Sequence, residues 1–225
     1  MNSDYYKAYD KRYRKTYEDG YLWEIPKPTS EVINIINKYK INKSDKILDL
    51  GCGEGRDALY LLDSGYNVLA VDYSINVIFK CNELSNNKYI DKFKQFDIFE
   101  DEINTKFDFI YSIAVIHMFI DENHRRKFYK FIYEHLNKDG KALIIAMGDG
   151  VKEYSTHTQD AFKETERINM NSNKKVLVAS TSLRIKSLEN MCKEITLSNF
   201  SIIDSYIIDC SPNFSLCEVF IVERG

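Results

Sequence analysis

The sequence predicts an α/β fold, a doubly wound Rossmann-like sheet of about seven strands with helices on both faces. Apolar runs of strand length alternate with longer stretches of helical periodicity, which is typical of βαβ units around a parallel sheet. A glycine-rich turn leads from the first apolar run into a helical stretch. The last two runs are separated only by the turn "CSPNF", so we expect a reversed C-terminal hairpin whose last strand is antiparallel.

The individual elements follow from these runs and from the residues that begin and end them. The strands are expected at residues 46–50, 68–71, 94–96, 107–113, 141–147, 202–209 and 216–222. The helices are expected at residues 29–38, 56–64, 74–86, 122–136 and 187–197. Ser30, Ser74 and Ser187 should cap three of them, because a serine oxygen accepts hydrogen bonds from the free amides of a first turn. Gly140, in the helix stop "NKDG", suits a left-handed C-cap.

Composition narrows the class of protein. A chain of 225 residues that is 44% hydrophobic can bury one sizeable core, so we expect a single domain over residues 1–225. A net charge of −3 gives no broad basic field, and no nucleic-acid partner is expected. The five cysteines form no CxxC or Cys/His cluster, which predicts reduced thiols and no metal site. No apolar segment resembles a signal peptide or a membrane span, so a cytoplasmic protein without membrane contact is expected.

The stretch "KILDLGCGEGRDALYLL" carries the main functional signal. Gly51, Gly53 and Gly55 form a turn through which a ligand can approach the backbone and the free amides of the next helix. Their GxGxG spacing differs from the GxGxxG of dinucleotide-binding loops, although spacing alone discriminates weakly.

The charge around this loop distinguishes between possible ligands better than the glycine spacing does. Asp49, Glu54 and Asp57 surround it, and only Arg56 compensates them, so a diphosphate fits badly. S-adenosylmethionine has no phosphate and carries a sulfonium and an ammonium cation, which favour an acid at the strand end. Its single carboxylate could use Arg56 or the helix amides.

Further residues at strand ends complete a candidate cofactor site. Asp72 ends the second strand about 20 residues after the loop and suits ribose hydroxyls, although alone it would be read as a solvated turn residue. Asp97 could accept from an adenine amino group beside Ile98, or be a plain surface acid. Ser112 and Val115 would border the cofactor near the switch point. The expected cofactor-binding residues are Tyr13, Tyr21, Trp23, Asp49, Gly51, Gly53, Arg56, Asp72, Tyr73, Asp97, Ile98, Ser112 and Val115.

These motifs together resemble the class I S-adenosylmethionine-dependent methyltransferases. "ILDLGCGEGRDALYLLDSGYNVLAVDYS" is similar to their first motif and acidic second-strand end, and "FDFIYSIAVIHMF" and "LNKDGKALI" are similar to their fourth- and fifth-strand motifs. The N-terminal "YDKRYRKTYEDGYLWEIPKPTSEV" resembles the lead-in of the small-molecule branch that includes tellurite-resistance and thiopurine methyltransferases. The resemblance implies S-adenosylmethionine as cofactor, S-adenosylhomocysteine as product and a small-molecule acceptor. In that lead-in the matching residues are Arg12, Tyr13, Tyr21, Trp23 and Pro26.

Tyrosines recur every four residues from Tyr5 to Tyr21, ahead of the first strand. On a helix they form one slowly drifting stripe, and such a stripe usually reports packing. The alternative is a lid over residues 1–28, because tyrosine faces attract cations and a sulfonium is one. We keep both interpretations, with Tyr13 or Tyr21 and Trp23 closing over the cofactor.

The acceptor side is less sharply defined by the sequence. Methyl transfer is an in-line displacement that alignment and water exclusion can largely catalyse. His117 is the candidate proton acceptor, and the alternative is a helix-start histidine satisfied by the backbone. Residues 148–186 are expected to form a substrate-covering insertion, in which "KVLVAST" alternates like an extra strand or lid element. The candidate substrate residues there are Tyr154, His157, Phe162 and Arg184, the last as partner of an acidic acceptor.

Three other functions stay open at this point. A methyltransferase acting on RNA or protein is one, and a module that binds S-adenosylmethionine without catalysis is another. A nicotinamide oxidoreductase is disfavoured by the loop carboxylates. The protein could be a monomer or a homodimer.

Overall fold

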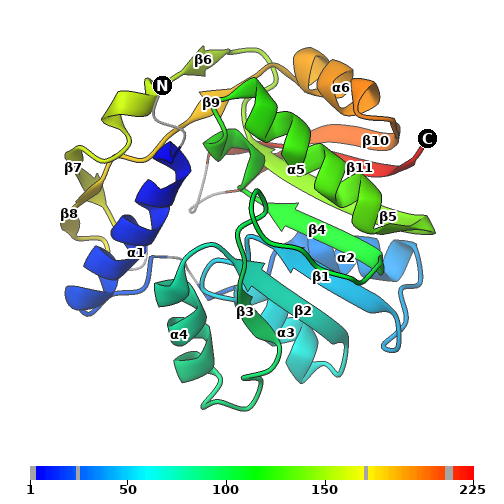
Figure 1. Ribbon diagram of the computed structural model, residues 1–225, viewed down its shortest axis with the longest axis horizontal. Helices are drawn as coiled ribbons and strands as arrows, with labels where there is room; N and C mark the ends of the chain where they lie inside the picture. The colour runs from blue at the N-terminus through cyan, green and yellow to red at the C-terminus, as the bar shows by residue number, and fades with distance from the viewer. Residues whose placement is uncertain (1–3, 24–25, 170–171, 211–214) are drawn as a thin grey trace.

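A seven-stranded sheet forms the centre of the computed structural model, which describes residues 4–23, 26–169, 172–210 and 215–225. The strand order is β10-β11-β5-β4-β1-β2-β3 (Figure 1). The strands are β1 (Lys46–Leu50), β2 (Asn67–Asp72), β3 (Phe93–Gln95), β4 (Phe107–Ile113), β5 (Leu136–Met147), β10 (Phe200–Asp209) and β11 (Leu216–Arg224). The first five are parallel, and β11 is antiparallel to both β5 and β10, which confirms the doubly wound sheet and the reversed hairpin. The turn "CSPNF" lies largely outside the described residues.

Helices cover both faces of this sheet (Figure 1). They are α1 (Ala8–Glu18), α2 (Ser30–Lys38), α3 (Arg56–Asp63), α4 (Ile75–Leu84), α5 (Glu122–His135) and α6 (Leu188–Leu197), with short 3-10 turns η1 (Tyr5–Lys7), η2 (Ile116–Met118) and η3 (Thr158–Asp160). The side chains of α2, α3 and α4 form one buried cluster with one face of the sheet. The side chains of α5 and α6 form a second buried cluster with the opposite face. No helix in the described ranges combines the length and apolarity needed to cross a membrane.

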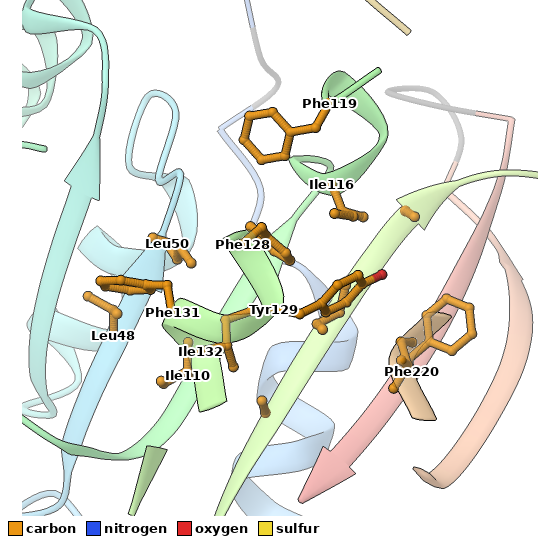
Figure 2. Close-up of a cluster of buried hydrophobic side chains, with 14 of the residues drawn as sticks. Leu48, Leu50, Ile110, Ile116, Phe119, Phe128, Tyr129, Phe131, Ile132 and Phe220 are labelled. Carbon is orange, nitrogen blue, oxygen red and sulfur yellow. The ribbon is translucent and has the colours of Figure 1, made fainter. Parts of the chain in front are cut away.

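The core beneath α5 shows why the central strands read as continuous apolar runs. Leu48 and Ile110 point from β1 and β4 into one cluster, while Phe128 and Ile132 point into it from α5, and all four are fully buried (Figure 2). Alternate residues of the same strands supply the cluster on the opposite face. Strands covered on both sides need apolar residues at nearly every position.

One buried polar group interrupts the core on this face. Glu218 lies on β11 opposite Ala146 and is completely shielded from solvent. Among the described residues no hydrogen bond of good geometry reaches either carboxylate oxygen, although the nearby Gly150 amide lowers the pKa of the group and so partly offsets the larger effect of burial. Burial raises the pKa of Glu218 to about 7, so the group gains a proton far more readily than an exposed glutamate does.

Two of the three predicted helix caps are confirmed. The Ser74 and Ser187 hydroxyls accept from the Val77 and Asn190 amides at 3.2 and 3.4 Å. Ser30 is wrong as a cap, because it is the first residue of α2 and Thr29 precedes the helix. Thr29 donates its hydroxyl and its amide to the Asp57 carboxylate. Asp57 therefore ties the start of α2 to the first turn of α3.

The predicted left-handed cap at Gly140 is also wrong. Gly140 is not among the glycines with positive φ, and it lies inside β5, which already begins at Leu136. A Cβ at Gly140 would lie 2.9 Å from Leu136 Cδ1 and 3.0 Å from the Asp108 carbonyl oxygen. The glycine is required there by the close approach of β5 to β4.

Residues 148–186 form two small sheets outside the central one. One pairs β6 (Tyr154–Ser155) with β9 (Arg184–Ile185), and the other pairs β7 (Glu164–Ile168) with β8 (Lys175–Ala179). The strand predicted from "KVLVAST" is confirmed as β8. Helix α1 packs along β8, so the N-terminal segment and this hairpin lie side by side at one edge of the molecule (Figure 1). We call α1, β7, β8 and the following residues 180–183 the cap.

Candidate active site

A cavity of about 380 Å³ lies between the carboxyl ends of the parallel strands and the cap. This is where doubly wound sheets bind ligands. Ten of the residues singled out from the sequence line it: Tyr13, Trp23, Gly51, Arg56, Asp72, Tyr73, Asp97, Ile98, Val115 and His117.

The glycine loop leaves β1 with its backbone turned toward this cavity. Gly51 has a φ of +80°, and a Cβ at this position would collide with the Val115 side chain. Both conditions require glycine there. The Gly53 amide, by contrast, donates to the Asp72 carboxylate at 3.1 Å, and Gly53 does not line the cavity. Arg56, in the first turn of α3, lines it with a largely buried side chain that is 3.6 Å from the Asp57 carboxylate.

Asp72 is a half-buried carboxylate at the end of β2. It accepts from the Gly53 amide and, at 2.9 Å, from the Ser74 amide, which fixes its orientation at the cavity wall. Burial raises the pKa of Asp72 to about 6, and the nearby Asp10 carboxylate contributes to the rise. The group is thus ionised at neutral pH but becomes protonated in mildly acidic solution.

Asp97 holds the corresponding position after β3. Its carboxylate accepts from the Tyr6 hydroxyl at 2.7 Å and from the Phe99 amide at 2.9 Å. The Tyr6 ring contacts the rings of Tyr73 and Phe99 edge-on, with centroids 5.5 and 5.0 Å apart. Tyr6 lies one residue off the four-residue tyrosine stripe, so that pattern did not indicate it.

The cap and the residues that follow α1 supply an aromatic wall opposite the strand ends. Tyr13 and Trp23 both line the cavity, and the Arg12 guanidinium lies over the Trp23 ring at 4.9 Å from its centroid. Tyr9 also lines it and donates its hydroxyl to the Ser182 carbonyl at 3.1 Å. Tyr21 does not line it, since its hydroxyl accepts from Lys174 on the outside of the cap.

Two residues assigned to the cofactor from the sequence lie behind the cavity wall. Asp49 is buried and accepts from the Tyr111 hydroxyl at 3.0 Å, on the face of β1 opposite to Leu48 and Leu50. The Ser112 hydroxyl donates to the Leu50 carbonyl at 2.8 Å. Alternation along β1 directs Asp49 away from the face of Leu48 and Leu50, and the Ser112 hydroxyl is engaged by the β1 backbone, and neither residue lines the cavity.

His117, in η2, lines the cavity and is buried. Its Nδ1 accepts from the Met147 amide at 3.3 Å, which assigns the proton of the neutral ring to Nε2. Burial lowers the pKa of His117 to about 3, and the charges of Arg125 and Arg12 add to the effect. The ring is therefore neutral at physiological pH and is held by the backbone, as one of the two interpretations of the sequence required.

The four candidate substrate residues do not lie on the cavity wall. Tyr154, His157 and Phe162 are exposed, and Arg184 donates to the Ile120 carbonyl and pairs with Glu122. Other residues of the cap and the N-terminal segment take that wall, chiefly Tyr6, Tyr9, Arg12, Arg167, Thr181 and Ser182. Of these, only Arg12 and the stripe member Tyr9 carried a sequence signal.

Solved structures with the same fold bind S-adenosylmethionine or carry methyltransferase names. An S-adenosylmethionine-dependent methyltransferase from Clostridium acetobutylicum superposes with a TM-score of 0.67 at 19% identity, over 98% of this chain and 99% of that one. TehB from Haemophilus influenzae gives a TM-score of 0.60 at 21% identity, over 88% of this chain and 62% of that one. The fold is that of the class I methyltransferases.

Sequence comparison narrows the class to a family. The model described as "Tellurite resistance protein TehB" matches residues 11–178, and the chain belongs to this family. A probable S-adenosyl-L-methionine-dependent methyltransferase TehB of Haemophilus influenzae is 35% identical over 114 residues, 50% of this chain and 40% of that protein. A phosphoethanolamine N-methyltransferase of Plasmodium falciparum is 30% identical over 135 residues, 58% of this chain and 48% of its own length. The chain thus spans about half the length of these curated relatives.

Proposed function

We propose that this protein transfers a methyl group from S-adenosylmethionine to a small-molecule acceptor. The observation that carries the proposal is the pair of carboxylates, Asp72 and Asp97, at neighbouring strand ends of one cavity beside a glycine that tolerates no side chain. Two acids at neighbouring strand ends suit the hydroxyl and amino donors of a nucleoside. We further propose that residues 1–225 form one methyltransferase domain. Within it, the N-terminal segment and residues 148–186 cover the ligand cavity.

Different residues of the cavity wall bind different parts of S-adenosylmethionine, the methyl donor. Asp72 accepts from the ribose hydroxyls, and Asp97 keeps lone pairs for the adenine amino group beside Ile98. Gly51 and Val115 lie under the methionine part, and Arg56 is the cation nearest the glycine loop that can meet its carboxylate. Bound donor supplies a methyl group on a sulfonium cation, and an acceptor atom attacks it in line. The aromatic cap keeps water away from that cation.

Acceptor chemistry depends on positioning more than on proton transfer. His117 is neutral and lines the cavity, and its ring is fixed by the Met147 amide at Nδ1. It accepts a proton poorly, because a charged ring is disfavoured in this buried place. We therefore propose that His117 orients the acceptor, and that the acceptor's proton leaves to solvent after methyl transfer.

A small acceptor is favoured over a macromolecule by the cap. Helix α1 and the β7–β8 hairpin cover the cavity with segments of the chain itself, held by Arg12, which donates to the Ala179 and Ser180 carbonyls, and by Tyr9. A polypeptide or nucleic-acid strand would have to displace them. The relatives differ in acceptor, since one is named a histidine protein methyltransferase homolog and another a phosphoethanolamine N-methyltransferase.

Two measurements test the proposal. Calorimetric titration with S-adenosylhomocysteine should give saturable binding that Asp72→Asn weakens by at least tenfold, since a charged acceptor contributes about 1.5–3 kcal/mol per hydrogen bond. Asp91→Asn, at an exposed site away from the cavity, is the control. Absence of any binding by the wild-type protein would overturn the cofactor assignment.

The second measurement asks where the methyl group goes. The protein is incubated with methyl-labelled donor and a cell extract separated into metabolite, protein and RNA fractions. Label in the metabolite fraction is expected. Label in protein or RNA would replace the small-molecule proposal by its alternative, and tight donor binding without any product would identify a non-catalytic binding module.

A further inference from the structure

Two arginines of the cap face the cavity together. Arg12 comes from α1 and Arg167 from β7, and both side chains line the wall. They are close enough for the charge of Arg167 to lower the pKa of Arg12, in addition to the larger effect of burial. Arg167 is exposed, so water screens much of the repulsion between the two charges, and an anion placed between them would be attracted by both.

Arg12 is held in place by neutral groups only. Its Nε and Nη2 donate to the Ala179 carbonyl at 3.1 and 3.0 Å, and Nη2 also donates to the Ser180 carbonyl at 2.7 Å. The guanidinium lies over the Trp23 and Tyr9 rings, 4.9 and 5.3 Å from their centroids. Within the described part of the chain no carboxylate pairs with it, and its Nη1 donates to no acceptor. The side chain is therefore fixed in orientation and keeps two N–H groups.

The backbone that receives Arg12 is itself strained. Thr181 has a φ of +65°, a conformation that a β-branched residue rarely adopts. It is maintained by the Thr181 amide, which donates to the Ala161 carbonyl at 2.8 Å, and by the Tyr9 hydroxyl bonded to Ser182. Strain of this kind persists where the surroundings fix it, and it concentrates at ligand sites.

Arg167 has even fewer partners. Among the residues that the structure describes, its guanidinium makes neither an ion pair nor a hydrogen bond, whereas its neighbour Glu166 pairs with Lys175 at 3.2 Å. The two carboxylates that line the cavity are engaged at the strand ends, Asp72 by backbone amides and Asp97 by Tyr6. The arginine pair thus lacks an anion of its own.

We propose that Arg12 and Arg167 bind an anionic group of the methyl acceptor, a carboxylate or a phosphate. The inference rests on the function proposed above and specifies its acceptor as an organic anion whose nucleophilic atom is separate from the charged group. Guanidinium N–H groups meet such oxygens in charge-assisted pairs, which fix direction as well as distance. Arg12 serves as the preoriented member of the pair, and the exposed Arg167 as the member without a fixed partner among the described residues.

The competing assignment is that these arginines hold the carboxylate of the donor. Arg56 lies beside the glycine loop and is the alternative cation for that group. The two assignments differ in a measurable way. If the pair serves the acceptor, removing Arg167 leaves the affinity for S-adenosylhomocysteine unchanged.

The experiment titrates sodium acetate or inorganic phosphate into protein saturated with S-adenosylhomocysteine and follows heat by calorimetry. We expect saturable binding of at least one anion, and the preferred one tells carboxylate from phosphate. Arg167→Gln should weaken it by at least tenfold, and Arg167→Lys should restore part of the loss. Lys175→Gln removes a positive charge from the same hairpin outside the cavity and should change nothing. The exposed Arg167 side chain makes no hydrogen bond or ion pair with the residues that the structure describes, so its variants should fold.

Each other result decides against the inference or against the proposed function. Wild-type protein that binds S-adenosylhomocysteine but neither anion overturns the inference and leaves the methyltransferase proposal intact. A loss of S-adenosylhomocysteine affinity in Arg167→Gln assigns the arginines to the donor. If S-adenosylhomocysteine does not bind at all, the proposed function fails, and the anion titration on the protein alone still decides whether the arginine pair is an anion site.

Discussion

Replacing Gly51 by alanine should be the most informative single change in the site. Two separate penalties apply there. The backbone is left-handed, with a φ of +80°, which costs an alanine about 1–2 kcal/mol. The new methyl group would also collide with one Val115 methyl and lie 3.5 Å from two further Val115 carbons. Overpacking of this size typically costs about 1–3 kcal/mol.

The chain offers a control that separates the two penalties. Gly20 is also left-handed, with a φ of +77°, but nothing lies within 4 Å of the Cβ it would acquire. Gly20→Ala should therefore lose only the conformational part, about 1–2 kcal/mol. Gly51→Ala should lose about 2–5 kcal/mol in total. Urea or guanidinium unfolding, with the free energies of unfolding compared at constant m-value, measures both.

A double-mutant cycle identifies the partner. Val115→Ala removes the methyl groups against which the new side chain would press, so the double variant should recover the collision penalty. Equal losses for Gly51→Ala and Gly20→Ala, or no coupling between Gly51 and Val115, would refute this account of the loop. Affinity for S-adenosylhomocysteine should fall together with stability in Gly51→Ala, because the loop backbone lines the cavity.

Three further predictions rest on buried polar groups. The pKa of Asp72 is raised to about 6, so its carboxylate loses the ionised, accepting form as the pH falls through 6. The affinity for S-adenosylhomocysteine should therefore drop below that pH. Calorimetric titrations of Asp72→Asn should show no such pH dependence. Tyr6→Phe removes the donor to Asp97 and should lower the free energy of unfolding by about 1–3 kcal/mol, whereas Tyr60→Phe on the surface should leave it unchanged. The pKa of Glu218 is raised to about 7 in the folded protein, so Glu218 destabilises the fold increasingly as the pH rises above the pKa of the group in the unfolded chain. Glu218→Gln should raise the free energy of unfolding by up to ~3 kcal/mol at pH 8 and by little at pH 5. A difference between variant and wild type that stays constant across pH in denaturant unfolding would contradict this.

Much of the sheet could be predicted because a parallel strand that is buried on both faces requires a continuous run of apolar residues in the sequence. The bounds of β1 and β4 agree with the predicted runs, since nearly every position of these strands faces a covered surface. The predicted N-cap at Ser30 and the predicted left-handed C-cap at Gly140 were wrong for the same reason. A cap and a left-handed turn depend on where the chain comes into contact with other elements, and neither Asp57 nor the β4 backbone is near them in the sequence.

The site was predictable where it follows the strand ends and unpredictable where the cap builds it. Asp72 and Asp97 lie on the cavity wall because strand ends converge at one edge. The position of Asp49 was less well predicted, because a charge argument does not say to which face a strand residue points. Arg167 and Thr181 could not be found at all, since they face the cavity only because the β7–β8 hairpin packs, through β8, against α1.

The cap also has a consequence for how the molecule forms. Arg12 is bonded to Ala179 and Ser180, which lie 167 and 168 residues away along the chain, while the strands β1 to β5 pair over much shorter separations. Contacts that close such long loops form late, because their entropy must be overcome before they contribute. On the ribosome, α1 emerges well before β8 and can dock only after β8 has been made. The sheet should therefore be assembled before the ligand cavity exists, and α1 should be among the last helices to acquire its native contacts.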